Sequence, residues 1–287
     1  MLLFCYHGGT LKRIGIIYHP LKEPAVKLAA ELKAFLQRKG LEAWSGSAWE
    51  AEKTRCNVDG SDLIVSIGGD GTILRAAQCI LPAQIPITGI NLGMLGFMTE
   101  LTVSEAKKQL TRLIDGEGWI DERAVIEAEL HRPGVKKSLK YYALNDVVAA
   151  RGDVVRVILV EVKIDGQPLT TYKADGVIVA TATGSTGYAL AAGGPVLLPK
   201  SHDMLLVPIL PHLSSSFRLV VSPDSAIELK VLTMHAAALS VDGHINPPLE
   251  NESVITVRRS KHTVQFLRIH PQDTFYLNLA ERLKGKQ

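Results

Sequence analysis

Apolar and polar positions follow two different periods along the first part of the chain. Short apolar runs of strand length alternate with longer segments in which apolar residues recur every three or four positions, as on one face of a helix. Leu28, Leu32 and Leu36 mark one such helix, and Gly40 ends it. The expected strands are residues 13–18, 41–44, 63–67 and 85–90, and the expected helices are residues 24–39, 73–80 and 102–114.

Strands that alternate with helices build a parallel sheet whose faces are covered by the helices. Thr102 and Glu105 match a capping box at the start of the third helix. Ligands of such sheets bind beyond the carboxyl ends of the strands. We therefore predict an α/β domain over residues 1–121, with its functional groups just after the strands.

The pattern changes after about residue 122, where valine, isoleucine, threonine and tyrosine are enriched. Period-two alternation and the turn pairs Asp165-Gly166 and Asp242-Gly243 favour antiparallel hairpins, with His244 exposed at the second tip. The strands expected here are residues 156–164, 172–182, 217–222, 226–232 and 253–258. We predict a β-rich domain over residues 122–266.

Composition narrows the class of protein. Apolar residues make up 46% of the chain, and 32 basic against 29 acidic residues leave a net charge of +3. The densest basic segments, residues 258–262 and 136–137, read as solvated strand ends, so we expect no nucleic-acid partner. The longest interior apolar run, residues 205–210, contains Pro208, so we expect no membrane span.

The three cysteines, Cys5, Cys56 and Cys79, have neither metal-ligand spacing nor a disulfide framework. Such usage is typical of a reducing compartment, and the apolar start at residues 1–6 is too short for a secretion signal. We therefore expect a soluble cytoplasmic protein. The tail, residues 267–287, either returns to the first domain or contains a short helix over its 273–283 segment.

The most informative segment is Gly-Gly-Asp-Gly-Thr at residues 68–72, which follows a buried strand and precedes a helix. Glycines at such a point let backbone N–H groups approach a phosphate, and the helix N-terminus adds partial positive charge. Asp70 itself would repel a phosphate. A carboxylate there can instead take a proton from a hydroxyl or hold a metal ion, and both roles indicate phosphoryl transfer.

Other polar segments leave alternatives open. Asn145 and Asp146 interrupt an apolar strand, either as a turn or bulge in water or as a pair that hydrogen-bonds a ligand. Residues 181–195 are rich in hydroxyls and glycine, as in an ordinary loop or in a cradle for sugar and phosphate groups. Tyr188 is either a stacking platform or part of the core. His212 lacks a metal-ligand partner and is interpreted as a hydrogen-bonding loop residue.

The sequence contains no P-loop, nucleophile elbow or complete dinucleotide fingerprint. Between about residues 12 and 257 it resembles the NAD kinase family. The acidic glycine segment also occurs in diacylglycerol and sphingosine kinases, whereas Thr-Gly-Ser-Thr at 183–186 together with Asn145-Asp146 is much more specific to NAD kinases. The matching segments are residues 68–72, 89–97, 143–146, 174–176, 183–188, 211–212 and 240–243.

The resemblance implies an α/β domain followed by a β-sandwich-like, NAD-binding domain, with the active site between them and completed by contacts in a homodimer or homotetramer. It implies ATP-dependent phosphorylation of the adenosine-ribose 2′-hydroxyl of NAD to give NADP, with Mg²⁺ carried in on the nucleotide. By this analogy Asp70 is the catalytic base. The other implied binding residues are Gly71, Thr72 and Arg75 near the phosphates, Asn145 and Asp146, Arg156, Lys173 and Asp175 (the last two for a neighbouring subunit), Thr183, Thr186, Gly187, Tyr188, Ala189, Leu190, Ala191 and His244.

The chain departs from the family pattern at Asp146, Ala182, Gly187 and His244, where glutamate, proline, alanine and glutamine are common. These differences leave the fit around the adenine and the choice between NAD and NADH open. Two other functions stay open as alternatives. One is a lipid kinase that shares the acidic glycine loop, and the other is a dinucleotide sensor without catalysis. The donor range, ATP alone or also polyphosphate, and feedback by NADPH stay open as well.

Overall fold

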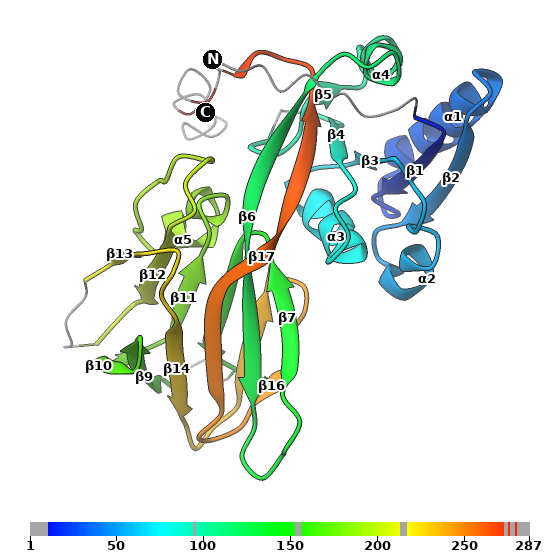
Figure 1. The fold of residues 1–287 in the computed structure, drawn as a ribbon. Coiled ribbons are helices and arrows are strands. Elements are labelled where there is room, and N and C mark those ends of the chain that lie inside the picture. Colours follow the sequence, from blue (N-terminus) through cyan, green and yellow to red (C-terminus); the bar gives the residue numbers. More distant parts are fainter. Residues whose placement is uncertain are drawn as a thin grey trace. The chain divides into compact units, whose positions relative to one another are not determined.

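The computed structural model describes residues 11–93, 96–152, 156–212, 217–272, 275 and 279. The chain separates into two units (Figure 1). One unit runs to Glu122 and resumes at Val264, and the other is Arg123–Thr263. Of the segments discussed in the sequence analysis, the apolar start at residues 1–6 and most of the tail segment 273–283 lie outside the described residues. Whether the predicted ranges 1–121 and 122–266 are independent domains stays a prediction.

The first unit contains a parallel sheet in the order β4-β3-β1-β2. The short strand β5 pairs with β4, and Phe266 near the end of β17 (Val254–Arg268) pairs with Ile87 of β4. Strand β3 is buried at all five positions, as expected for a central strand between two neighbours. The helices and strands of this first unit are β1 (Arg13–Tyr18), α1 (Glu23–Arg38), β2 (Glu42–Ser47), α2 (Ala51–Arg55), β3 (Leu63–Ile67), α3 (Asp70–Ile80), β4 (Ile87–Asn91), β5 (Leu101–Thr102) and α4 (Ala106–Ile114).

Helices α1 and α4 pack on one face of this sheet. Leu28, Leu32 and Leu36 of α1 share a buried cluster with Leu110 of α4 and with Ile16 of β1, as the helical spacing predicts. Helix α3 contacts β3 and β4 and packs against α2. Because the strands are parallel, the loops after β1, β3 and β4 leave the sheet at the same edge.

The second unit is built from two antiparallel arrangements. In one, β10, β9, β14 and β17 pair in that order, and β6 pairs with β17 and β7; in the other the order is β13-β12-β11-β8-β15-β16. Its elements are β6 (Trp119–His131), β7 (Leu139–Ala143), β8 (Asp146–Arg151), β9 (Ile158–Ile164), β10 (Gln167–Ala174), β11 (Gly176–Ala180), the 3₁₀ turn η1 (Gly184–Thr186), α5 (Tyr188–Ala191), β12 (Met204–Ile209), β13 (Leu219–Val221), β14 (Ile227–Leu232), β15 (Ala237–Val241), β16 (Pro248–Leu249) and β17 (Val254–Arg268). β6 and β17 each begin in one unit and end in the other.

The main core of this unit lies between the two layers of strands. Alternate residues of β14 and β15 are buried in it, whereas β11 is buried at every position. Val177 and Val179 of β11 face this core, and Ile178 joins a second cluster with Ala189 of α5. The strand is therefore covered on both faces, one of them by the short helix α5. This α/β unit followed by a β-rich unit agrees with the predicted fold class.

Several expected elements need correction. The apolar run around Asn145 is two strands, β7 and β8, which pair with different partners. The expected strand 172–182 is divided at Asp175 between β10 and β11, and β17 is far longer than residues 253–258. Helix α4 begins at Ala106, although Glu105 accepts the Thr102 N–H as the capping box predicts. The sequence pattern did not predict β6, β12, β15 or α2.

Among the described residues, no helix is long and apolar enough to span a membrane.

Candidate active site

Asp70 lies where the sequence predicts, at the first position of α3 and beyond the carboxyl end of β3. Glycine is required at position 68, because a Cβ there would lie 2.1 Å from the hydroxyl oxygen of Thr72. Thr72 is buried, so its side chain supports the turn. Gly71 is exposed and has open space around its Cα, which lets a ligand approach the backbone of the first helical turn.

The carboxylate of Asp70 accepts hydrogen bonds from three consecutive backbone N–H groups. Phe97 donates to Oδ2 at 2.8 Å, and Met98 and Thr99 donate to Oδ1 at 3.1 and 3.3 Å. A carboxylate offers about four lone-pair sites, so about one remains for a further partner. Asp70 is thus both the anchor of the loop after β4 and a group with capacity left to accept one proton.

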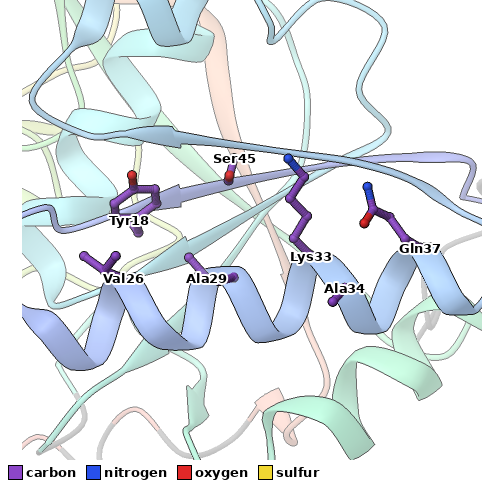
Figure 2. Close-up of a pocket in the computed structure, with 8 residues that line it drawn as sticks. Tyr18, Val26, Ala29, Lys33, Ala34, Gln37 and Ser45 are labelled. Carbon is purple, nitrogen blue, oxygen red and sulfur yellow. The ribbon is translucent and has the colours of Figure 1, made fainter.

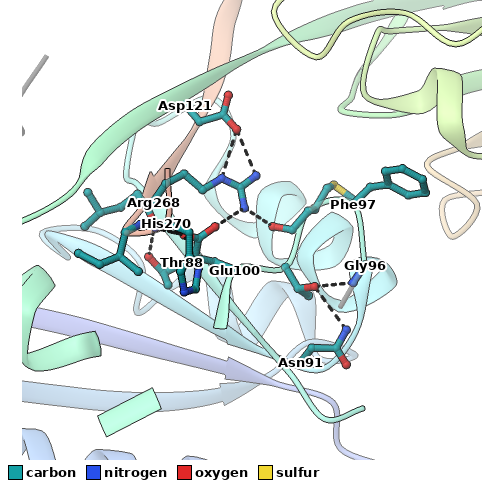
Figure 3. A network of polar contacts seen from close by, with 12 residues as sticks. Thr88, Asn91, Gly96, Phe97, Glu100, Asp121, Arg268 and His270 are labelled. Atoms are coloured by element: carbon teal, nitrogen blue, oxygen red, sulfur yellow. Dashed lines mark hydrogen bonds and ion pairs between the residues drawn. The ribbon is translucent and has the colours of Figure 1, made fainter. Parts of the chain in front are cut away.

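Gly96 allows this close approach. A Cβ at Gly96 would lie 2.2 Å from Oδ1 of Asp70, a distance that no side chain can occupy without moving the carboxylate or the loop. Thr99 closes the same loop by accepting the Gly96 N–H at 2.7 Å, and Asn91 donates to the same hydroxyl at 3.3 Å (Figure 3). The loop therefore has its own hydrogen-bonded frame around Asp70.

Arg75 lies one turn further along α3, and its guanidinium stacks over the ring of Trp49, with 4.3 Å from Cζ to the ring centroid. His19, which follows β1, packs against the same ring at 4.3 Å between centroids. Burial is the main cause that lowers the pKa of His19, and the charge of Lys22 adds to it. In the first unit, the structure therefore brings Asp70, Gly71, Thr72 and Arg75 together on one helix.

In the second unit, Asn145 and Asp146 are joined to a buried carboxylate. Asp242 accepts backbone N–H groups from Leu144 at 3.0 Å, from Asn145 at 2.7 Å and from Asp146 at 3.2 Å. Asp146 is only 6% exposed, which excludes the interpretation of the pair as a water-facing turn. The Oδ1 atom of Asn145 is buried without a protein partner. A buried amide oxygen of this kind is suited to a ligand donor.

Asp146 and Asp242 form a buried pair of acids. Burial, with a smaller contribution from the charge of Asp242, raises the pKa of Asp146 to about 7. Asp242 itself lies in the predicted hairpin, where Asp242 and Gly243 have φ angles of 49° and 71°. His244 is half-buried rather than exposed, and its Nδ1 lies 2.9 Å from the carbonyl oxygen of Asp242.

The hydroxyl-rich loop after β11 folds against the same corner. A Cβ at Gly184 would lie 2.1 Å from the carbonyl oxygen of Asn145, so the loop and the Asn-Asp pair are in direct contact. Thr181 donates its hydroxyl to the Leu144 carbonyl at 2.6 Å, and Arg123 donates to the hydroxyl of Thr183 at 3.3 Å. The second unit thus brings together Asn145, Asp146, Thr183, Thr186, Gly187 and His244 around one corner.

The following helix, α5, divides the remaining predicted residues of this loop. Tyr188 is 49% exposed, which excludes the core interpretation and leaves its ring available for stacking. Ala189 is fully buried, so its side chain packs in the core and only its backbone can reach a ligand. Leu190 is half-buried and Ala191 is exposed.

Other predicted residues lie elsewhere in the second unit. Asp175 precedes β11 and forms an ion pair with Arg151, with 2.9 Å between Nε and Oδ1, whereas Thr181 follows the strand. At about 3.3 Å per residue, the five residues of β11 place these ends roughly 20 Å apart. Lys173, Arg156 and His212 are exposed, and the His212 N–H donates to the Lys173 carbonyl. The segment 213–216 next to His212 lies outside the described residues.

The described residues include a pocket in the first unit, between α1 and the edge strand β2 (Figure 2). Its lining includes no predicted site residue; Figure 2 labels Tyr18, Val26, Ala29, Lys33, Ala34, Gln37 and Ser45. Over the same described ranges, no three His, Cys, Asp or Glu side chains gather as metal ligands. The candidate site therefore consists of two groups of polar residues, one around Asp70 in the first unit and one around Asn145 and Asp146 in the second.

Comparison with known proteins identifies the class. The N-terminal domain of ATP-NAD kinases matches residues 42–118, and the C-terminal domain of ATP-NAD kinases matches residues 144–269. A protein of Dehalococcoides mccartyi named NAD kinase is 51% identical over 96% of each chain, and one of Chloroflexus aurantiacus is 42% identical over 96% of this chain and 99% of its own.

Solved structures agree. Yeast NADH kinase, in complex with NADH, superposes with a TM-score of 0.82 at 25% identity, covering 97% of this chain and 89% of the yeast chain. An NAD kinase from Archaeoglobus fulgidus, in complex with ATP, superposes with a TM-score of 0.75 at 27% identity, covering 96% and 100%. The fold and the sequence define a two-domain nucleotide kinase. The chain belongs to the NAD kinase family.

The contact between Gly96 and Asp70 predicts an asymmetry between two glycines of one loop. We expect Gly96→Ala to lower the free energy of unfolding by about 1–3 kcal/mol, because the new methyl overlaps the carboxylate. Gly93→Ala is the matched control, since a Cβ at Gly93 meets nothing within 4 Å, and it should change stability by less than about 0.5 kcal/mol. Urea unfolding measures both, and equal effects would contradict the close packing.

The burial of Asp146 predicts a pH-dependent stability. Its pKa is about 7 in the folded protein against an ordinary 3.8, so between these values the folded protein holds a proton that the unfolded chain has released. The free energy of unfolding therefore falls as pH rises through that window. The free energy of unfolding of Asp146→Asn, taken relative to that of wild type, should therefore rise by about 2–3 kcal/mol from pH 5 to pH 8, since the linkage is ~1.36 kcal/mol per pKa unit. Parallel profiles for the two proteins would refute this.

Proposed function

We propose that the protein transfers the terminal phosphoryl group of ATP to the 2′-hydroxyl of the adenosine ribose of NAD, giving NADP. Membership of the NAD kinase family supports this activity. The observation that supports the chemistry most directly is Asp70, an acid at the start of α3 whose carboxylate has about one acceptor site left after three N–H donors.

In this mechanism Asp70 takes the proton of the ribose hydroxyl as its oxygen attacks the γ-phosphorus of ATP. The bond between that phosphorus and the bridging oxygen breaks, and ADP leaves with the electron pair. Phosphoryl transfer requires little covalent work from the protein, so positioning and charge neutralisation supply most of the acceleration. Gly71, exposed at the first turn of α3, offers backbone to the phosphates, and Arg75, stacked on Trp49, supplies positive charge.

Mg²⁺ would enter with ATP as part of the substrate. A hard divalent cation prefers phosphate oxygens and water, and in kinases it commonly needs only one or two protein carboxylates. Its charge would offset that of the phosphates. Within the first unit, Asp70 is the carboxylate placed at the helix start, where it could meet a nucleotide-bound ion as well as the hydroxyl.

The second unit supplies the groups proposed to bind NAD. The unpartnered Oδ1 of Asn145 can accept from a ligand N–H or O–H, and Asp146, with a pKa of about 7, can donate or accept depending on its proton. Tyr188 offers an exposed ring for stacking on a base. The residues proposed to line this part of the site are Asn145, Asp146, Thr183, Thr186, Gly187, Tyr188, Leu190, Ala191 and His244, with Ala189 contributing backbone.

Two further proposals concern the setting of the protein. Cys56 and Cys79 are free thiols, as expected in a reducing cytoplasm, and we place the protein there. We also infer a homo-oligomer in which Lys173 and Asp175, at the far end of β11 from Thr181, serve the site of a neighbouring subunit. The exposed Arg156 is proposed as a further residue that lines the site.

Asp70→Asn tests the proposed reaction. We expect kcat for NADP formation to fall at least about 100-fold, since a general base is worth about 10²–10⁴. The KM for NAD should change only a few-fold. The assay couples NADP to an NADP-specific dehydrogenase, with ATP or polyphosphate as donor. Turnover near that of wild type would remove Asp70 from the role of base.

Asp62→Asn is the matched control for this variant. Asp62 also accepts two backbone N–H groups, from Lys12 at 2.7 Å and from Arg13 at 2.8 Å, but it precedes β3 and so lies at the opposite edge of the sheet. Its loss should affect stability without affecting kcat. If wild-type protein instead phosphorylates a diacylglycerol or a sphingoid base, the lipid-kinase alternative holds, and NAD binding without turnover would indicate a sensor.

Mixing two inactive variants tests the shared site. If Asp175 serves a neighbouring subunit, Asp175→Ala and Asp70→Asn chains should each be inactive alone but recover part of the NADP-forming activity when mixed and allowed to exchange subunits. In a mixed dimer, one site would combine an intact Asp70 with an intact Asp175. Two Asp70→Asn variants mixed together, the second also carrying Asp175→Ala, are the control and should stay inactive. No recovery in the first mixture would place Asp175 in its own subunit's site, whereas full activity of Asp175→Ala alone would place it in no site.

A further inference from the structure

A buried cluster of charges lies against the loop that holds Asp70. Arg268, the last residue of β17, is 6% exposed, and its two carboxylate partners, Glu100 and Asp121, are 8% and 6% exposed. The guanidinium Nη1 lies 3.1 Å from Oε2 of Glu100, and Nη2 lies 3.2 Å from Oδ2 of Asp121 (Figure 3). Its flat face lies 4.7 Å from the ring centroid of Phe266. Two carboxylates and one aromatic ring thus hold the guanidinium group of Arg268 in place.

The same guanidinium reaches the loop directly. Nη1 of Arg268 donates to the carbonyl oxygen of Met98 at 2.8 Å, and the N–H of Met98 donates to Asp70. Glu100, two residues further on, accepts the backbone N–H groups of Ile269 and His270, both at 2.8 Å. The loop is therefore tied to the end of β17 at two points, and one residue, Met98, joins Arg268 on its C=O side to Asp70 on its N–H side.

We propose that Arg268 is a positioning residue for phosphoryl transfer: it holds the 96–99 loop, and through the loop's N–H groups it sets the direction of the Asp70 carboxylate. A rigid, forked guanidinium suits this task, because it can bind two carboxylates and a carbonyl oxygen at once, as a lysine ammonium cannot in the same geometry. The inference rests on the proposed role of Asp70 as the base.

The geometry makes a buried charge useful here. A buried ion cluster is not in itself a source of stability, since desolvation offsets the attraction between the charges. Here the cluster also fixes an orientation. Arg268 holds the carbonyl oxygen of Met98, and the N–H of the same residue donates to the proposed base, Asp70. A reacting group displaced by about 1 Å can lose about 100-fold in rate, so a small loop shift would be felt at Asp70.

Arg268→Lys tests the proposal because it keeps the positive charge and removes the fork. We expect kcat for NADP formation to fall at least about tenfold, with the KM values for NAD and ATP within about twofold. In the Asp70→Asn background the same substitution should have no further effect on the residual kcat, because the group that it positions is already absent. Hydrogen exchange at the amides of 97–99 should be faster in Arg268→Lys than in wild type.

Thr88→Val is the matched control. The Thr88 hydroxyl donates to the carbonyl of Leu267 at 2.8 Å, so its loss weakens the same end of β17 without touching the loop. It should lower the melting temperature but leave kcat and the exchange of the 97–99 amides unchanged. If Arg268→Lys does not fold, Asp121→Asn is the milder variant, which should lower kcat a few-fold in the wild-type background and not in the Asp70→Asn background.

The outcomes separate the two proposals. Wild-type kcat in Arg268→Lys, or an equal loss in both backgrounds, overturns the positioning role, as does unchanged exchange of the loop amides. If instead Asp70→Asn alone keeps wild-type turnover, the proposal of Asp70 as the base fails first.

Discussion

A carboxylate that accepts three consecutive backbone N–H groups organises each unit of this protein. Asp70 does so for residues 97–99 and Asp242 for residues 144–146. Backbone donors that leave a strand and have no ladder partner are costly to bury unsatisfied, and one anion can satisfy three of them. The loop and the acid then define one another. Apart from Arg156, Lys173 and Asp175, the proposed phosphate contacts follow the first of these carboxylates on α3, and the proposed NAD contacts lie beside the second one or on the loop that packs against Asn145.

The two carboxylates, Asp70 and Asp242, differ in their surroundings and in their capacity to accept a further hydrogen bond. Asp242 is buried beside a second acid, Asp146, whose pKa is raised mainly by burial and further by the charge of Asp242. Asp70 lies at a half-buried helix start, with space beside the exposed Gly71. The same arrangement therefore serves as a pure support in one unit and, in the proposed mechanism, as a support with a spare acceptor in the other. A reactive group that also bears structure cannot be replaced without cost to both roles.

Much of the fold follows from local pattern. The leucine spacing of α1, the buried run of β3 and the glycine turns at 165–166 and 242–243 are all found as predicted. The sequence also indicated where Asp70 lies, because strand, glycine loop and helix are contiguous. The roles of Asp242, Gly96 and Arg268 were missed, because their partners are distant in sequence: Asp70 is 26 residues from Gly96, Leu144 is 98 residues from Asp242 and Met98 is 170 residues from Arg268. Asp242 was also already accounted for as a turn residue. A single sequence carries no signal for such pairings. It also gives no clear signal for the long strands β6 and β17, because each begins in one unit and ends in the other.

The path of β17 has a practical consequence for dissecting the molecule. The α/β unit is not contiguous in sequence: it ends at Glu122 and is completed only from Val264 onward. A gene fragment that stops after Glu122 would encode the acidic glycine loop and both buried acids, Glu100 and Asp121, but not the cation that offsets their charge. Recombinant expression of the α/β unit alone would therefore require the segment from Val264 onward to be joined back to it, by circular permutation or by a linker that replaces the β-rich unit.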